Sequence, residues 1–263
     1  MSGNRIVPAD IRDGLDRGEF FLEYLPTMAL DDGRCLGAEA LIRWRRPSGL
    51  VSPGQFIPLI ENSPYAGILT YWVMDTMTSE MGDWLDANRE AYLGINVPPE
   101  ILGRGGMAYV ASKSGLVRHA PQLMIEITER GLPDAVGIES INQRSAGGAM
   151  VALDDVTFVA AATLAILMRC NFDAIKLDKS LIDQITPQSP APDWLRGATM
   201  LVESSKLTVI AEGVETEQQS VVLREAGLHS AQGFYYSRPL AGPAFRDFYR
   251  DHQPNRATPS EVH

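Results

Sequence analysis

Short apolar and β-branched runs recur along the chain, most of them separated by longer segments that are compatible with helices. About eight of these runs have the composition of strands, and they begin at Phe20, Cys35, Tyr92, Leu123, Ala149, Ala174, Leu207 and Ala231. The later runs are almost wholly apolar rather than alternating, which is expected when helices cover both faces of a parallel sheet. Between them, segments such as residues 68–88 have the spacing of amphipathic helices.

Repeated strand and helix segments predict an α/β fold, specifically a (β/α)8 TIM-like barrel, and 263 residues suit one such barrel. The main alternative is a doubly wound open sheet, which normally has a glycine-rich first turn. The GRGGMA stretch at Gly103 neither follows a strand nor has that glycine spacing. We therefore expect a single domain over residues 1–250, a proline-rich loop over residues 186–194 and a flexible tail over residues 251–263.

The net charge of −10 and the absence of a Lys/Arg cluster that would track a phosphate backbone argue against a nucleic acid polymer as partner. A small anionic ligand stays compatible with this charge if metal ions invert the sign of an acidic pocket. Cys35 and Cys170 form no CxxC pair, so neither a zinc cluster nor a disulfide framework is indicated. With no signal-peptide core and no membrane span in the pattern, we expect a cytoplasmic protein without a membrane partner.

Polar residues fall within or at the carboxyl ends of the apolar runs: Glu39, Asn96, Glu126, Asp154, Asp155, Lys176, Asp178, Glu212 and Gln232. A barrel gathers these strand ends on one face, where barrel enzymes place their active sites. Carboxylates gathered in this way repel each other unless cations neutralise them, and oxygen ligands suit Mg²⁺ or Mn²⁺. The adjacent aspartates could extend the site to a second ion about 3.5–4 Å away, an arrangement that hydrolyses phosphodiesters.

Each of these residues also has an ordinary structural interpretation. A strand-end Glu can cap a helix or pair with a cation, Asn96 can form a turn, Lys176 can lie over apolar neighbours, and Asp154 with Asp155 can cap a helix. The repetition of the pattern from strand to strand is what favours a joint site. Other chemistries lack support, because the four histidines share no ligand spacing and neither GxSxG nor HExxH is present.

The segment GAEALIRWRRPSG, with Glu39, Ala40 and Leu41, resembles the defining motif of the EAL-domain family of bacterial cyclic di-GMP phosphodiesterases. The similarity continues through VSPGQFIPLIE, INVPPEIL, IEITE, LDD, IKLDKSLI, VIAEGVET and QGFYYSRPL, across about residues 20–248. The resemblance implies an imperfect (β/α)8 barrel that depends on Mg²⁺ or Mn²⁺, is inhibited by Ca²⁺, and hydrolyses cyclic di-GMP to linear pGpG.

The resemblance also implies roles for individual residues. Metal ligands would be Glu39, Asn96, Glu126 and Asp154, with Asp155 completing the second site. Lys176 and Glu212 would position and activate the attacking water. Substrate contacts would come from Arg43, which suits a phosphate, and from Leu41, Asp178, Glu215 and Gln232. Glu129 matches the residue that steadies the loop after the two aspartates.

Two segments depart from the family pattern. Active members usually continue the aspartate pair as DFGTGYSS, a loop near the second metal and the dimer interface, whereas this chain has DVTFVAAAT. Val156, Thr157 and Phe158 lack the backbone freedom of glycine. In addition, Leu25 stands where the family has a Gln that can contact a guanine.

These departures keep three hypotheses open. The first is a metal-dependent cyclic di-GMP phosphodiesterase with reduced activity. The second is a cyclic di-GMP receptor that does not hydrolyse the nucleotide and regulates a protein partner, and the third is a protein-binding module that has lost the nucleotide. A homodimer is compatible with the first two hypotheses.

Overall fold

A computed structural model describes residues 6–128, 133–143, 148–157 and 167–254. Its strands are β1 Phe20–Ala29, β2 Cys35–Arg46, β3 Gly49–Val51, β4 Tyr92–Asn96, β5 Leu123–Thr128, β6 Met150–Val156, β7 Ala174–Leu177, β8 Thr208–Ala211 and β9 Ser230–Gln232. The α-helices are α1 Ala9–Asp16, α2 Pro53–Ile60, α3 Pro64–Ala87, α4 Gly106–Ser114, α5 Ala135–Asn142, α7 Lys179–Ile182, α8 Asp193–Ser204, α9 Glu217–Glu225 and α10 Gly242–Asp251. Two 3-10 helices, η1 Pro99–Ile101 and η2 Leu116–Gln122, complete the described elements.

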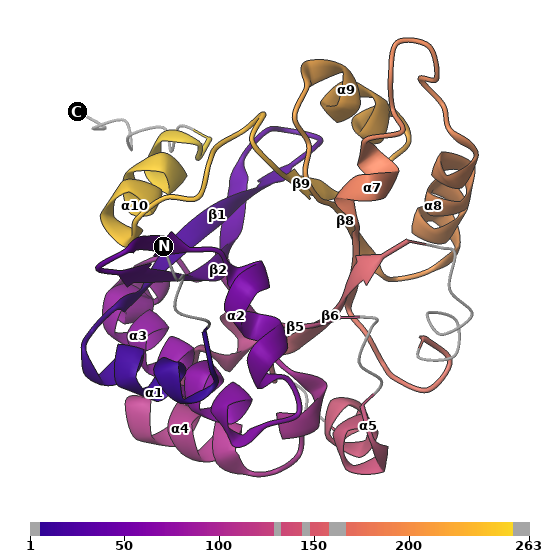
Figure 1. Cartoon of the computed structure of the whole chain (residues 1–263). Coiled ribbons are helices and arrows are strands. Elements are labelled where there is room, and N and C mark those ends of the chain that lie inside the picture. Colours follow the sequence, from indigo (N-terminus) through magenta and orange to yellow (C-terminus); the bar gives the residue numbers. More distant parts are fainter. Residues whose placement is uncertain (1–5, 129–132, 144–147, 158–166, 255–263) are drawn as a thin grey trace, which may run out of the picture.

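The strands form a closed barrel with helices around its outside (Figure 1). From β2 through β4, β5, β6, β7, β8 and β9, neighbouring strands are parallel, and β1 closes the ring by pairing with both β9 and β2. The short β3 extends β2 as a hairpin outside the ring. The predicted single (β/α)8-type barrel is confirmed, and every one of the expected apolar runs contains a strand.

One strand gives the barrel its imperfect character, because β1 is antiparallel to both of its neighbours. The chain between Ala29 and Cys35 is too short for the crossover that two parallel strands require, so β1 and β2 must form a hairpin. The outer side of β1 is covered by α10, where Phe245 stacks on Tyr24 at 5.9 Å between ring centroids and meets the edge of Trp84 from α3 at 5.2 Å. Aromatic packing therefore protects the seam at which the barrel closes.

The last strand is shorter than the apolar run predicts. AQGFYY is strand only as far as Gln232, because the chain turns at Gly233 with a φ of 151°. A Cβ at this position would lie 2.2 Å from the carbonyl oxygen of Val214, so only glycine permits this close approach. The residues after Gln232 leave the barrel wall instead of lining it.

Beyond α10, the chain stays against the barrel for a few residues. The backbone carbonyl of His252 accepts a hydrogen bond from the Cys35 amide at 3.1 Å, and the Gln253 side chain donates to the Cys35 carbonyl at 2.8 Å. The remainder of the predicted tail, residues 255–263, lies outside the described residues. Within the described part of the chain, none of the helices has the length and apolar character needed to cross a bilayer.

Candidate active site

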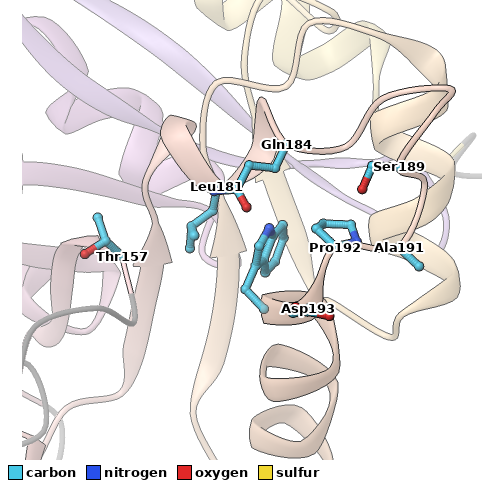
Figure 2. A pocket seen from close by; sticks show the side chains of 8 residues that line it. Thr157, Leu181, Gln184, Ser189, Ala191, Pro192 and Asp193 are labelled. Atoms are coloured by element: carbon cyan, nitrogen blue, oxygen red, sulfur yellow. The ribbon is translucent and has the colours of Figure 1, made fainter.

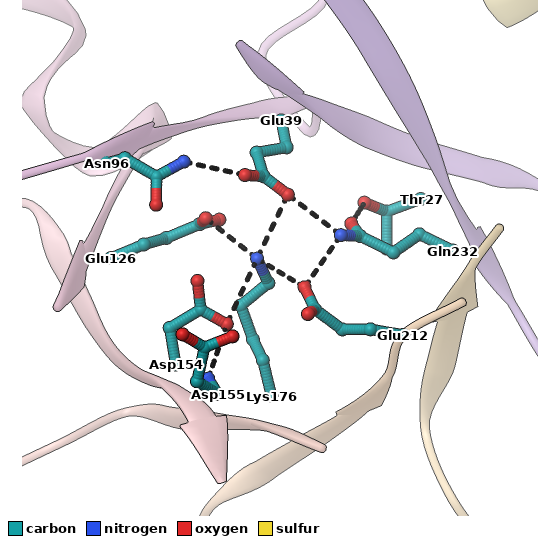
Figure 3. Close-up of polar contacts among 9 residues, drawn as sticks. All are labelled: Thr27, Glu39, Asn96, Glu126, Asp154, Asp155, Lys176, Glu212 and Gln232. Carbon is teal, nitrogen blue, oxygen red and sulfur yellow. Dashed lines mark hydrogen bonds and ion pairs between the residues drawn. The ribbon is translucent and has the colours of Figure 1, made fainter. Parts of the chain in front are cut away.

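A buried lysine lies at the centre of the polar cluster inside the barrel (Figure 3). The Nζ atom of Lys176, on β7, lies 2.6 Å from Glu212, 2.8 Å from Glu126, 3.0 Å from Glu39 and 3.5 Å from Asp154. Its side chain is only 1% exposed. The four carboxylates come from within or directly after four different strands, so the barrel assembles a cluster that no single segment of the chain contains.

Strand register explains how two of these carboxylates meet. Glu39 on β2 pairs with Gly94 on β4, and Asn96 on β4 pairs with Glu126 on β5. The Asn96 side chain donates to Glu39 at 2.6 Å. A Cβ at Gly94 would lie 2.2 Å from an oxygen of Glu126, so the missing side chain leaves the space that this carboxylate fills. Gly94 is a site residue that the strand-end pattern does not indicate.

Gln232, predicted as a substrate contact, lies beneath the carboxylates and is 3% exposed. Its Nε2 donates to Glu39 and to Glu212, both at 2.8 Å, while its Oε1 accepts from the Thr27 hydroxyl at 3.2 Å. Thr27 thereby fixes which end of the amide faces the carboxylates. In the structure, Gln232 holds the carboxylates of Glu39 and Glu212 in place. Thr27 supports Gln232 in turn, and the sequence analysis did not identify it.

A β-bulge aims two adjacent aspartates at the same site. Successive strand residues normally point to opposite faces. The pairing of β6 with β7 shifts register between Leu153 and Val156, and Asp155 has a φ of 58°, in the left-handed region that Asp tolerates better than most residues. One oxygen each from Asp154, Asp155 and Glu212 lies within 4.8 Å of the other two. Because of the bulge, both consecutive aspartates can act as ligands of one metal ion or of two neighbouring metal ions.

Burial and mutual repulsion perturb the acids strongly. Burial, reinforced by Glu39, raises the pKa of Glu126 well above its usual range. Burial also raises the pKa of Asp154 to about 6 and that of Glu212 to about 8, although Lys176 opposes both shifts. Burial acts to raise the pKa of Glu39 as well, but Lys176 and the bond from Gln232 outweigh it and the pKa is lowered.

The lysine responds in the opposite way. Burial acts to lower the pKa of Lys176, but the carboxylates of Asp154, Glu126, Glu212 and Glu39 outweigh it and raise the pKa well above the usual value. Lys176 therefore keeps its charge. If all five acids were ionised, the five carboxylates and one ammonium would carry four excess negative charges, and the raised pKa values of Glu126, Asp154 and Glu212 oppose that state. Bound divalent cations would neutralise this excess, and hard oxygen donors are the ligands that Mg²⁺ and Mn²⁺ prefer.

The remaining predicted contacts have other partners or lie outside the cluster around Lys176. Arg43 donates through Nε to Glu23 at 2.7 Å. Asp178 caps α7 by accepting from the amide of Ser180 at 2.9 Å, and the exposed Glu215 pairs with Lys179 at 2.9 Å. Leu41 is partly buried on β2, and Glu129 lies outside the described residues.

A cavity of about 660 Å³ is lined by a residue that follows β6 and by residues from α7 to the start of α8 (Figure 2). Thr157, which follows the aspartate bulge, forms one side, and α7 with the loop before α8 forms the other. None of the clustered carboxylates lines this cavity. The cavity is therefore a feature separate from the carboxylate cluster.

This fold and this acidic site agree with a known family. The family model described as "EAL domain" matches residues 9–239, and the chain belongs to the EAL-domain family. Among its relatives is an uncharacterized protein of Mycobacterium tuberculosis, which is 34% identical over 254 residues. That alignment covers 91% of this chain and 40% of the relative, so the chain spans well under half of that relative's length.

Two comparisons involve a protein of named activity. MucR of Pseudomonas aeruginosa, a bifunctional diguanylate cyclase/cyclic di-GMP phosphodiesterase, is 31% identical over 238 residues, covering 88% of this chain and 34% of MucR. The solved structure "PaMucR Phosphodiesterase, c-di-GMP complex" superposes with a TM-score of 0.79 and 30% identity, covering 90% of this chain and 98% of that one. The similarity to MucR is thus confined to part of that longer protein.

Proposed function

We propose that this domain hydrolyses cyclic di-GMP to linear pGpG with Mg²⁺ or Mn²⁺ bound at the barrel mouth. The observation that carries the proposal is the convergence of four carboxylates on Lys176, with Asp155 beside them and oxygens of Asp154, Asp155 and Glu212 within 4.8 Å of one another. Membership of the EAL-domain family and similarity to MucR, a named cyclic di-GMP phosphodiesterase, support cyclic di-GMP as the substrate. The reaction class follows from the acidic site and the substrate from the relatives.

The donor set fits two divalent cations. Glu39, Asn96, Glu126 and Asp154 would hold one, and Asp155 would complete the site for the other, with Glu212 close enough to contribute. When bound, such cations supply charge stabilisation to the phosphate and lower the pKa of the attacking water. Glu39 and Glu126 both bond to Lys176, which prevents them from swinging apart before cations arrive.

Hydrolysis forms a bond between the water oxygen and phosphorus and breaks the bond from phosphorus to the 3′ oxygen, which leaves as a hydroxyl. Glu212 is the group placed to accept the proton of the water, since it is less enclosed than Glu126 and its pKa of about 8 falls when cations bind nearby. Lys176 has no capacity for that step because its raised pKa keeps it protonated. Its role is to position the carboxylates and balance their charge.

The substrate-facing residues follow from their places at the mouth. Arg43 can donate to a phosphate, and Leu41 can pack against a base. Asp178 and Glu215 are proposed acceptors for a guanine, although the first also caps α7 and the second pairs with Lys179. Gln232 acts indirectly, by holding Glu39 and Glu212. A homodimer and a regulatory protein partner stay predictions.

The test is incubation of the purified protein with cyclic di-GMP in Mg²⁺, Mn²⁺ or Ca²⁺, with pGpG followed by chromatography. We expect product with Mg²⁺ or Mn²⁺ and suppression by Ca²⁺. Glu39→Gln should reduce turnover by about 100-fold or more, because it removes a ligand charge at constant size. The matched control is Glu80→Gln, which alters a part-buried carboxylate bonded to Tyr24.

Two results would contradict the proposal. Full turnover by the Glu39→Gln protein would show that the carboxylate cluster is not the active site. Binding of cyclic di-GMP without product under any of the metals would instead support a receptor that does not cleave the nucleotide. Thermal melting of both variants confirms that the fold is intact.

A further inference from the structure

An ion pair at the barrel mouth already occupies the guanidinium predicted to meet the nucleotide. Glu23 on β1 and Arg43 on β2 are diagonal neighbours, because Glu23 pairs in register with Leu41 and Phe21 pairs with Arg43. Arg43 Nε lies 2.7 Å from Glu23 Oε2, and the side chains are 16% and 30% exposed. Both groups are shielded enough to interact, yet both reach solvent where a ligand would enter.

The pair takes up one donor of the Nε edge of Arg43, which is one of the two edges by which a guanidinium can bind a phosphate. A guanidinium binds an oxyanion best with two parallel N–H donors. Here Nε donates to Glu23, and Nη1 donates to the carbonyl oxygen of Ile42 at 3.2 Å. A phosphate that binds both donors of the Nε edge must therefore displace the Glu23 carboxylate or accept its negative charge as a close neighbour.

Strand geometry relates this pair to the carboxylate cluster. Glu39, Leu41 and Arg43 alternate along β2 and share one face, and Leu25 and Glu23 face them from β1. Arg43 lies four positions after Glu39, or roughly 13 Å along an extended strand. Because β2 is parallel to β4, Arg43 lies on the carboxyl side of Glu39, above the cluster. Arg43 of the pair and Glu39 of the cluster therefore lie along the same strand, with both Arg43 and Glu23 reaching solvent.

We propose that Glu23 competes internally with the nucleotide phosphate for Arg43 and thereby weakens nucleotide binding at this site. The inference rests on the proposed function, in which cyclic di-GMP occupies the barrel mouth. It adds a residue outside the carboxylate cluster that sets affinity without taking part in the chemistry. Glu23 is thus an affinity-determining residue, not a catalytic residue.

The experiment is calorimetric titration of the full chain with cyclic di-GMP in Ca²⁺, where hydrolysis is suppressed. Glu23→Gln removes the charge at constant size, and Glu23→Asp keeps the charge but draws the carboxylate back from Arg43. The matched control is Asp10→Asn, which makes the same change in net charge at a carboxylate that lies 3.6 Å from Arg46, further along β2. Melting curves verify that each variant folds.

We expect Glu23→Gln to lower the Kd by about three- to tenfold, the size of one partly screened ion pair. Glu23→Asp should lower it by a smaller factor, and Asp10→Asn should leave it within about twofold. In Mg²⁺, Glu23→Gln should lower KM while kcat stays unchanged, which separates competition for Arg43 from a merely structural role.

Each other outcome decides against the inference in a distinct way. Weaker or unchanged binding by Glu23→Gln, with a wild-type protein that binds normally, overturns the competition and leaves the proposed function standing. Tighter binding by Glu23→Gln but not by Glu23→Asp means that general repulsion acts instead of the ion pair, and the inference fails. If neither the wild type nor any variant binds cyclic di-GMP, the inference and the proposed function fail together.

Discussion

Replacing Lys176 with methionine should destabilise the protein strongly in buffer without divalent cations. The ammonium is 1% exposed and lies within 3.5 Å of four carboxylates, so its loss leaves buried negative charges with no cation between them. Removing one partner of a buried ion pair costs about 3–5 kcal/mol. Methionine fills a similar volume, so the loss reports charge and not a cavity.

This free energy converts to a clear thermal shift. A protein of 263 residues has an unfolding entropy of roughly 0.55 kcal/mol/K, from about 2.1 cal/mol/K per residue. A loss of 3–5 kcal/mol therefore lowers Tm by about 5–9 °C. Without Lys176, the folded-state pKa values of Asp154 and Glu212 rise further above their unfolded values, and Glu39 loses the cation that lowers its pKa. The loss at Glu39 is therefore present already in mild acid, and the destabilisation should grow further as pH rises through the values of about 6 for Asp154 and about 8 for Glu212.

The assay is calorimetric melting of both proteins across this pH range, with and without Mg²⁺. Mg²⁺ should recover part of the lost stability, since a cation that binds the folded state restores positive charge to the cluster. Lys179→Met is the matched control, because Lys179 also pairs with two carboxylates but is 45% exposed, and such surface pairs contribute about 0–1 kcal/mol. A Lys176→Met protein no less stable than the Lys179→Met protein would refute the account of the cluster as mutually dependent charges.

Three further predictions concern the acids themselves. Cation binding should tighten between pH 6 and pH 8 and release protons, because Asp154 and Glu212 must ionise to bind a cation. Calorimetry in buffers of different ionisation enthalpy measures the proton release, and a pH-independent affinity would contradict the prediction. Asp155→Asn and Asp155→Ala should both weaken cation binding. Only the alanine variant should also lose about 1 kcal/mol of stability, because Asn tolerates the left-handed backbone at this position. Equal melting temperatures of the two variants would count against a strained bulge. Gly94→Ala should displace Glu126 and weaken cation binding. Gly197→Ala is the control, because a Cβ there meets open space and should leave the cation affinity unchanged. Equal cation affinities of the two variants would show that Gly94 does not shape the site.

Much of the fold followed from local periodicity. The nearly continuous apolar runs predict buried parallel strands, and the polar residues that interrupt them predict where the chemistry lies. The reversed direction of β1 was also accessible, because the five residues between Ala29 and Cys35 cannot span a parallel crossover. The (β/α)8 prediction did not include the reversed direction of β1, because it was based on apolar composition, which does not specify strand direction.

The finer geometry of the site depends on contacts between distant segments. The register shift at Asp154 and Asp155 arises from the pairing of β6 with β7, and the sequence of β6 alone does not indicate it. The space at Gly94 acquires meaning only when Glu126 lies beside it. Likewise, Gln232 has the same strand-end position as the other polar residues, and its burial beneath Glu39 and Glu212 comes from closure of the barrel.

The antiparallel β1 has a consequence for the order in which the protein folds. Its hairpin with β2 closes a loop of a few residues, whereas its pairing with β9 joins Thr27 to Gln232, 205 residues apart. Loop-closure entropy favours early formation of the hairpin and late formation of the distant pairing. Because the late contact also orients the amide that holds Glu39 and Glu212, a chain with its hairpin and most parallel strands in place still lacks an organised cation site. Cation binding is therefore expected to mark the final step of folding, after most of the secondary structure has formed.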